Sequence, residues 1–144
     1  MISYKDIKLA VNTLLSNQFQ IEIQSNDVKE GFKRPSFFVE LDDMERSSTD
    51  TQVEKNLTIR ILYFPSDRYS YSSEILGVQE ELEELFDLKL HVADRHLNIQ
   101  ESVSDIVDGV LDFSFEIHFF DGRPSRLENG SDIQIMQELL LKRG

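Results

Sequence analysis

The fold is decided by the stretch VLDFSFEIHFF, residues 110–120, in which apolar and polar side chains alternate. Its odd positions from 111 to 119 hold leucine, isoleucine or phenylalanine, whereas its even positions from 112 to 118 hold aspartate, serine, glutamate and histidine. Successive side chains of a strand point to opposite faces of a sheet. The stretch therefore predicts a strand with one face in a core and the other face wet or used for assembly.

The remaining elements are predicted from the spacing of apolar residues on either side of this stretch. Alternation predicts strands over residues 19–23, 36–41, 53–64, 88–92 and 97–101. Helical spacing predicts helices from a cap at Ser3 to about Gln18, from about Ser73 to Phe86, and from Asp132 onward. The second helix is predicted to bury a stripe comprising Ile75, Leu76, Leu82, Leu85 and Phe86.

Two polar stretches, about 42–52 and 121–131, predict long loops. Strands follow strands directly on both sides of the second helix, which favours hairpins over crossover connections. We therefore expect one α+β domain over residues 1–144, with a mainly antiparallel sheet and its helices packed on one face. The end of the strand over 53–64 is apolar on both faces, so we expect it to be covered on both sides.

Composition excludes several classes of protein. The chain has 144 residues and 40% hydrophobic residues, enough for one packed domain. Cysteine is absent, which excludes disulfides, thiolate zinc sites and thiol nucleophiles and agrees with a reducing cytoplasm. The polar start, residues 1–6, predicts no signal peptide, and no run approaches the roughly 18 apolar residues of a membrane span.

The charge balance is strongly acidic, with 27 acidic residues against 15 basic ones and a net charge of −12. An acidic surface repels both nucleic acid and anionic membranes, whereas DNA-binding domains carry basic patches. The short basic cluster over 29–34 contains Glu30 and is too small to reverse this. We expect no specific binding to nucleic acid or to a membrane.

No motif in the sequence indicates catalysis or a bound cofactor. His91 and His96 flank a turn, but their spacing does not ensure convergent metal ligands, and they are interpreted with His118 as ordinary histidines. The glutamates over 80–84 read as a solvated helix face rather than an acid–base pair. Nucleophile-elbow and phosphate-loop motifs are missing. We expect a protein that is not an enzyme and binds neither metal nor cofactor; a small enzyme whose site no motif reveals stays as an alternative.

Two loops carry the residue types that subunit interfaces favour. Arginine and tyrosine contribute much of the contact energy where a partner buries them. The candidate interface residues in these loops are Arg68, Tyr69, Tyr71, Arg123 and Arg126. Their predicted acidic counterparts on a neighbouring copy are Asp42, Asp43 and Glu45.

Four segments carry a resemblance to a known family: YKDIK at 4–8, VKEGFKRPSFFV at 28–39, ILYFP at 61–65 and VLDFSFEI at 110–117. Together they resemble the tail terminator family of prophages and contractile tail-like particles in Gram-positive bacteria. The resemblance covers residues 3–120, and its most distinctive part is the run GFKRPSFF at 31–38.

The resemblance implies a structural protein of the virion tail that assembles in the host bacterial cytoplasm. Such a protein would form a hexameric ring at the head-proximal end of the tail, cap the tube and stop its polymerisation. Its implied partners are copies of itself, the tail tube protein, and sheath and neck or connector proteins. Another head–tail joining or tail completion protein is the alternative, because these share small α+β folds. A stable ring would favour the terminator.

Overall fold

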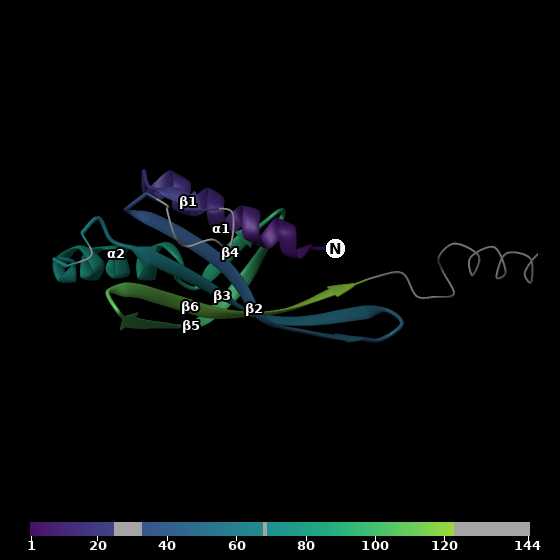
Figure 1. The fold of residues 1–144 in the computed structure, drawn as a ribbon. Coiled ribbons are helices and arrows are strands. Elements are labelled where there is room, and N and C mark those ends of the chain that lie inside the picture. The colour runs from purple at the N-terminus through teal and green to yellow at the C-terminus, as the bar shows by residue number, and fades with distance from the viewer. Residues whose placement is uncertain (25–32, 68, 123–144) are drawn as a thin grey trace, which may run out of the picture.

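The computed structural model describes residues 1–24, 33–67 and 69–122, which form two helices and six strands (Figure 1). In chain order the elements are α1 (Tyr4–Gln18), β1 (Glu22–Gln24), β2 (Ser36–Ser48), β3 (Gln52–Phe64), α2 (Ser72–Leu85), β4 (Lys89–Val92), β5 (Arg95–Val107) and β6 (Val110–Gly122). The predicted final helix from Asp132 and most of the predicted loop over 121–131 lie outside the described residues. Within the described ranges, no helix is long and apolar enough to cross a membrane.

The strands form one curled sheet in the order β1-β2-β3-β6-β5-β4. Four of the neighbouring pairs are antiparallel, as predicted. The pair β1–β2 is parallel, with Glu22 beside Ser36 and Gln24 beside Phe38, so the sheet is mixed. A parallel neighbour requires the chain to cross back between two strands, and alternation within each strand carries no information about that crossing.

Helix α1 begins and ends where the sequence predicts. The Ser3 hydroxyl accepts a hydrogen bond from the Asp6 N–H at 3.0 Å, and the Asp6 carboxylate accepts one from the Ser3 N–H at 3.1 Å. This reciprocal capping box satisfies two N–H groups that the first helical turn leaves unpaired. Hydrogen bonds with the Ser3 N–H and hydroxyl stabilise the charged form of the Asp6 carboxylate and so lower the pKa of Asp6.

The core lies between the helices and the odd-numbered side chains of β3 and β6, and this confirms the predicted register. Phe115 is 1% exposed, and its ring stacks on Phe86 with centroids 5.1 Å apart. Buried residues of both helices join the same core, and α1 lies across the sheet in Figure 1. These helix residues are Ile7, Val11 and Leu15 of α1 and Ile75, Val78 and Leu82 of α2.

Strand β1 is shorter than the predicted strand over 19–23, and β5 is longer than the one over 97–101. Two expectations about buried faces also need correction. Leu76 does not belong to the buried stripe of α2; it is 54% exposed, and Val78 takes the place predicted for it. The helix buries positions 75, 78 and 82, and position 76 lies about 100° around the axis from 75. The even-numbered end of β3 is covered only in part, because Leu62 and Phe64 are half-buried.

The predicted loop over 42–52 is instead the outer part of a long β-hairpin. Strand β2 continues to Ser48, β3 begins at Gln52, and only residues 49–51 form the turn. This paired end, residues 45–56, projects past the start of α1 (Figure 1), and we call it the arm. Backbone hydrogen bonds hold it as a ribbon, and its tip lies outside the core, so no apolar alternation marks it in the sequence.

A β-bulge lies at the base of the arm. Asp42 pairs with Thr58 and Glu45 with Asn56, so Asp43 and Met44 together face one residue of β3. Asp43 has a φ of 51°, in the left-handed region. An extra residue of this kind bends the strand and shifts the side-chain alternation by one.

Two buried charges close the core below the arm. The Lys55 ammonium donates to the carbonyl of Ile2 at 3.3 Å and lies 4.5 Å from the centroid of the Tyr4 ring. The Asp121 carboxylate, 5% exposed as a residue, accepts the Ile2 N–H at 3.0 Å and pairs with Arg95. The chain just before α1 is thereby fastened to both β3 and β6.

At the opposite end of β3, Glu74 joins the strand to α2. Its Oε2 accepts hydrogen bonds from the Tyr63 hydroxyl, from the Ser66 N–H at 2.8 Å and from the Ser66 hydroxyl at 2.9 Å. Burial and this carboxylate together raise the pKa of Tyr63. Burial alone would raise the pKa of Glu74, but the donors on Tyr63 and Ser66 outweigh it and hold that pKa below its usual value.

Replacing Phe115 tests the core. Phe115→Ala should lower the free energy of unfolding by about 3–5 kcal/mol, because it removes a ring packed on every side. Phe120→Ala is the matched control: it changes the same residue type in the same strand, on the other face, where Phe120 is 45% exposed. We expect a loss below about 1 kcal/mol there. Urea denaturation measures both, and equal losses would contradict the register.

Replacing Glu74 tests the link between β3 and α2. Glu74→Gln should cost about 1–2 kcal/mol at pH 7, since hydrogen bonds to a carboxylate are stronger than those to an amide. A lowered folded-state pKa contributes stability above the unfolded pKa and loses it as the pH falls through the folded value. The difference from wild type should therefore shrink as the pH falls from about 5 to about 3. Denaturation at several pH values checks this, with the solvated Glu84→Gln as control; a pH-independent difference would exclude the charge as its cause.

Candidate assembly surface

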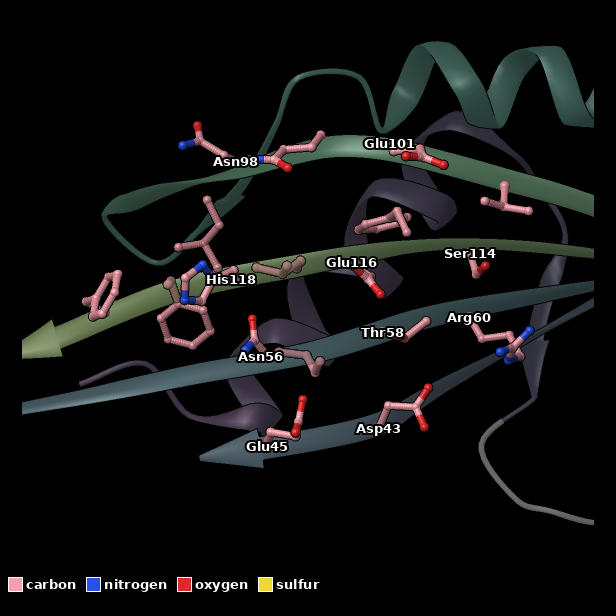
Figure 2. Close-up of a pocket in the computed structure, with 18 of the residues that line it drawn as sticks. Asp43, Glu45, Asn56, Thr58, Arg60, Asn98, Glu101, Ser114, Glu116 and His118 are labelled. Carbon is pink, nitrogen blue, oxygen red and sulfur yellow. The ribbon is translucent and has the colours of Figure 1, made fainter. Parts of the chain in front are cut away.

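We call the face of the sheet that turns away from the core the open face. A polar trough lies on it. The trough has a volume of about 1040 Å³ and lies over β2, β3, β6 and β5 (Figure 2). Its floor consists of even-numbered residues of the two central strands. Among its labelled lining residues are Asn56, Thr58, Arg60, Ser114, Glu116 and His118 from the floor, and Asp43, Glu45, Asn98 and Glu101 from the flanking strands.

Arg60 ties three strands together at one end of the open face. Its Nε lies 2.9 Å from Asp42 on β2, and its Nη1 lies 2.7 Å from both carboxylate oxygens of Asp112 on β6. The hydrogen bond to Asp42 and, to a smaller extent, the one to Asp112 raise the pKa of Arg60. Asp42, predicted to meet an arginine of a neighbouring copy, is thus already paired within its own protomer.

The histidines lie toward the other end of the open face. His118 Nε2 lies 2.5 Å from Glu54 Oε2, and its ring centroid lies 5.1 Å from that of Phe120. His91 and His96 pair across the β4–β5 hairpin with ring centroids 4.3 Å apart. In the described part of the chain, no three histidine, aspartate or glutamate side chains gather in a way that could hold a metal ion.

Four acidic residues and two arginines line the trough, and both arginines, Arg60 and Arg95, are already paired with carboxylates. Asp43 and Glu45 stand on the β2 side, Glu101 on the β5 side, and Glu116 in the floor between them (Figure 2). The guanidinium of Arg60 is shared by two further carboxylates. A surface of this composition suits a polar or basic protein surface and repels phosphate.

The predicted interface residues lie in different places. Tyr69, between β3 and α2, is 86% exposed, and its N–H donates to Asp67 Oδ1 at 2.8 Å. Tyr71 is half-buried, and its ring covers the turn between β5 and β6; a Cβ at Gly109 would lie 3.0 Å from Tyr71 Cε1. Tyr71 therefore contributes to packing within its own protomer. Arg68, Arg123 and Arg126 lie outside the described residues.

The two predicted halves of the interface stand far apart along β3. Tyr69 follows the end of this strand, whereas Glu45 pairs with Asn56 in its first half. A cyclic ring needs two different patches on each subunit, placed so that one patch meets the other on the next copy. This separation is compatible with such a ring.

Sequence reasoning missed the trough, although a signal for it exists. The polar residues at even positions of residues 53–64 and 110–120 mark one face of each strand. Only the pairing of Thr58 with Glu116 and of Arg60 with Ser114 shows that these faces are the same one. The roles of Arg60 and His118 depend on that pairing and carry no local signal.

A family model described as phage tail terminator protein matches residues 6–127, a range that includes nearly all of α1 and every strand. No curated protein matches the chain.

Replacing Arg60 tests the fastening on the open face. Arg60→Ala leaves Asp42 and Asp112 facing each other without the cation, so we expect a loss of about 1–2 kcal/mol in the free energy of unfolding at low salt. Part of this loss should return at about 0.5 M salt, which screens the two carboxylates. Urea denaturation at both salt concentrations measures the effect. The exposed Arg46→Ala is the matched control, and equal losses in the two variants would argue against the fastening.

Proposed function

We propose that this chain, which belongs to the phage tail terminator family, caps the head-proximal end of a tail tube as a hexameric ring and joins the tail to the neck. The observation that carries the proposal is the family match across residues 6–127. The family consists of structural proteins, and it gives the chain a structural role in a phage tail.

The partners follow from that role. The ring would contact the tail tube protein below it and neck or connector proteins above it, and in a contractile tail also the sheath. The resemblance in the sequence favours prophages and tail-like particles of Gram-positive bacteria as the setting, with assembly in the bacterial cytoplasm. An acidic ring would repel DNA that passes through it, so the role requires no specific contact with nucleic acid.

The charge of the protein sets the energetics of such a ring. Copies with a formal charge of −12 repel one another, so assembly must bury apolar or paired surface. Single exposed ion pairs contribute only about 0–1 kcal/mol, so tyrosine burial has to supply much of the affinity. Association should therefore be modest in free solution and firm on a tube end, which adds contact area.

The two arginine-bearing loops test the capping role. The double variants Arg68→Ala/Tyr69→Ala and Arg123→Ala/Arg126→Ala should cap fewer tube ends in negative-stain images of tail tubes mixed with the protein. The first pair should keep the melting temperature, because Tyr69 is almost fully exposed. Tyr71→Ala is the contrasting variant and should lower stability. Normal capping by both double variants would remove these loops from the interface.

Mixing variants tests whether the interface has two different halves. One variant carries Arg68→Ala/Tyr69→Ala and the other carries Asp43→Asn/Glu45→Gln, so each keeps one intact patch. If the ring interface is heterologous, one molecule of each variant can form a single intact contact, and no further copy can add to that pair. The mixture should therefore stop at dimers. Light scattering under conditions where the wild type assembles measures this. Rings from the mixture would show that the two patches do not meet.

A further inference from the structure

The outer edge of β5 is only half covered. On one side β5 pairs with β6 as far as Val107. On its other side β4 pairs only with residues 95–98. Among the strands of the described chain, none lies beside Ser102–Val107. Such an edge presents unpaired backbone groups and can accept another strand.

The turn after β5 determines which backbone groups point outward. Asp108 and Gly109 have φ values of 52° and 74°, and Val107 pairs with Val110 across them. In a two-residue hairpin of this kind the flanking pair exchanges hydrogen bonds, and hydrogen-bonded and non-bonded pairs then alternate along the strand. The N–H groups of residues 103, 105 and 107 therefore face β6, and those of residues 102, 104 and 106 face outward.

One hydrogen bond agrees with this assignment and shows how the free edge is protected. The Ile106 N–H donates to the carboxylate of its neighbour Asp105 at 2.9 Å. An N–H engaged with β6 would not be available to that side chain. A charged residue that covers an edge group in this way is a usual defence against unwanted pairing.

The edge carries apolar and acidic side chains beside two serines, Ser102 and Ser104. Val103, Ile106 and Val107 are 55%, 42% and 55% exposed, an unusual display for β-branched residues. Residues 100–109 include Glu101, Asp105 and Asp108 and no basic residue. Val103, Asp105 and Val107 share the open face, whereas Ile106 lies on the other face beside Leu111. A complementary strand would therefore place lysine or arginine on the open face, opposite Asp105, and apolar side chains on the face of Ile106.

We propose that Ser102–Val107 is a docking site for an extended basic segment of another protein, which adds a strand to the sheet beside β5. A carbonyl of the incoming strand takes the Ile106 N–H, and a lysine or arginine takes the Asp105 carboxylate. A second copy suits the edge poorly, because its opposite edge is itself acidic. There β1 offers Glu22 and no basic residue, and the part of β2 that β1 leaves uncovered has one basic residue, Arg46, against four acidic ones. The site goes beyond the proposed ring contact, which uses other loops, and does not depend on the capping role.

The test uses the full chain and a blocked peptide of alternating lysine and valine, with an alternating glutamate and valine peptide as control. Hydrogen exchange followed by NMR should show slower exchange at the amides of residues 102, 104 and 106 with the lysine peptide. The amides of 103, 105 and 107, already bonded to β6, should change little. Uniform protection along β5, or equal binding of both peptides, would overturn the proposal.

Two variants sharpen the result. Ser104→Pro removes an outward N–H without touching the bonds to β6 and should abolish binding, while retained protection at 103 and 105 shows that the hairpin is intact. Glu101→Lys/Asp105→Lys should weaken the lysine peptide about tenfold and bind the glutamate peptide instead. Protection of 102, 104 and 106 without any peptide, together with a doubled mass in solution, would overturn the choice of partner in favour of a second copy.

Discussion

The pairing of β3 with β6 is the constraint on which the rest of the structure depends. Their register sets Ile59 beside Phe115 and Thr58 beside Glu116, so apolar residues share one face and polar residues the other. The helices cover the first face, and the second becomes the floor of the trough. A slip of one residue in either strand would turn its apolar side chains outward and its polar ones into the core. Core and candidate surface are thus two results of a single register.

The same sheet is held at both ends by carboxylates that satisfy several donors at once. Glu74 fixes the end of β3 to α2, and Asp121 fixes the end of β6 to the chain before α1. Arg60 joins β2, β3 and β6 between them. Several carboxylates of this strongly acidic chain thus act as hydrogen-bond acceptors within the protomer. The acids that remain along the trough and the β5 edge are then those available to partners.

Strong periodicity of apolar residues made the centre of the fold predictable. Elements without such periodicity could not be predicted. Alternation located β6, β3 and the buried Phe115, and the serine and aspartate of the capping box located the start of α1. The arm was not predicted, because backbone pairing between its strands needs no apolar side chains. The parallel β1 and the position of Arg60 between Asp42 and Asp112 depend on contacts between distant residues. Of the candidate interface residues, Tyr69 is exposed, whereas Tyr71 packs over the turn between β5 and β6; residue type alone could not predict this difference.

The bulge at Asp43 and Met44 is the one place in the arm where a single residue can be lost without changing which side chains face the trough. Before the bulge the even positions of β2 share the open face with Thr58 and Arg60, and after it the odd positions, such as Glu45, do so. Loss of one bulge residue would leave Glu45 opposite Asn56 and Arg46 opposite Lys55, because one residue would then face one residue of β3. A single residue lost farther along the outer strand would instead turn part of that strand to the opposite surface. In related chains, single-residue changes of arm length should therefore fall at the bulge, and changes elsewhere in the arm should come in matched pairs.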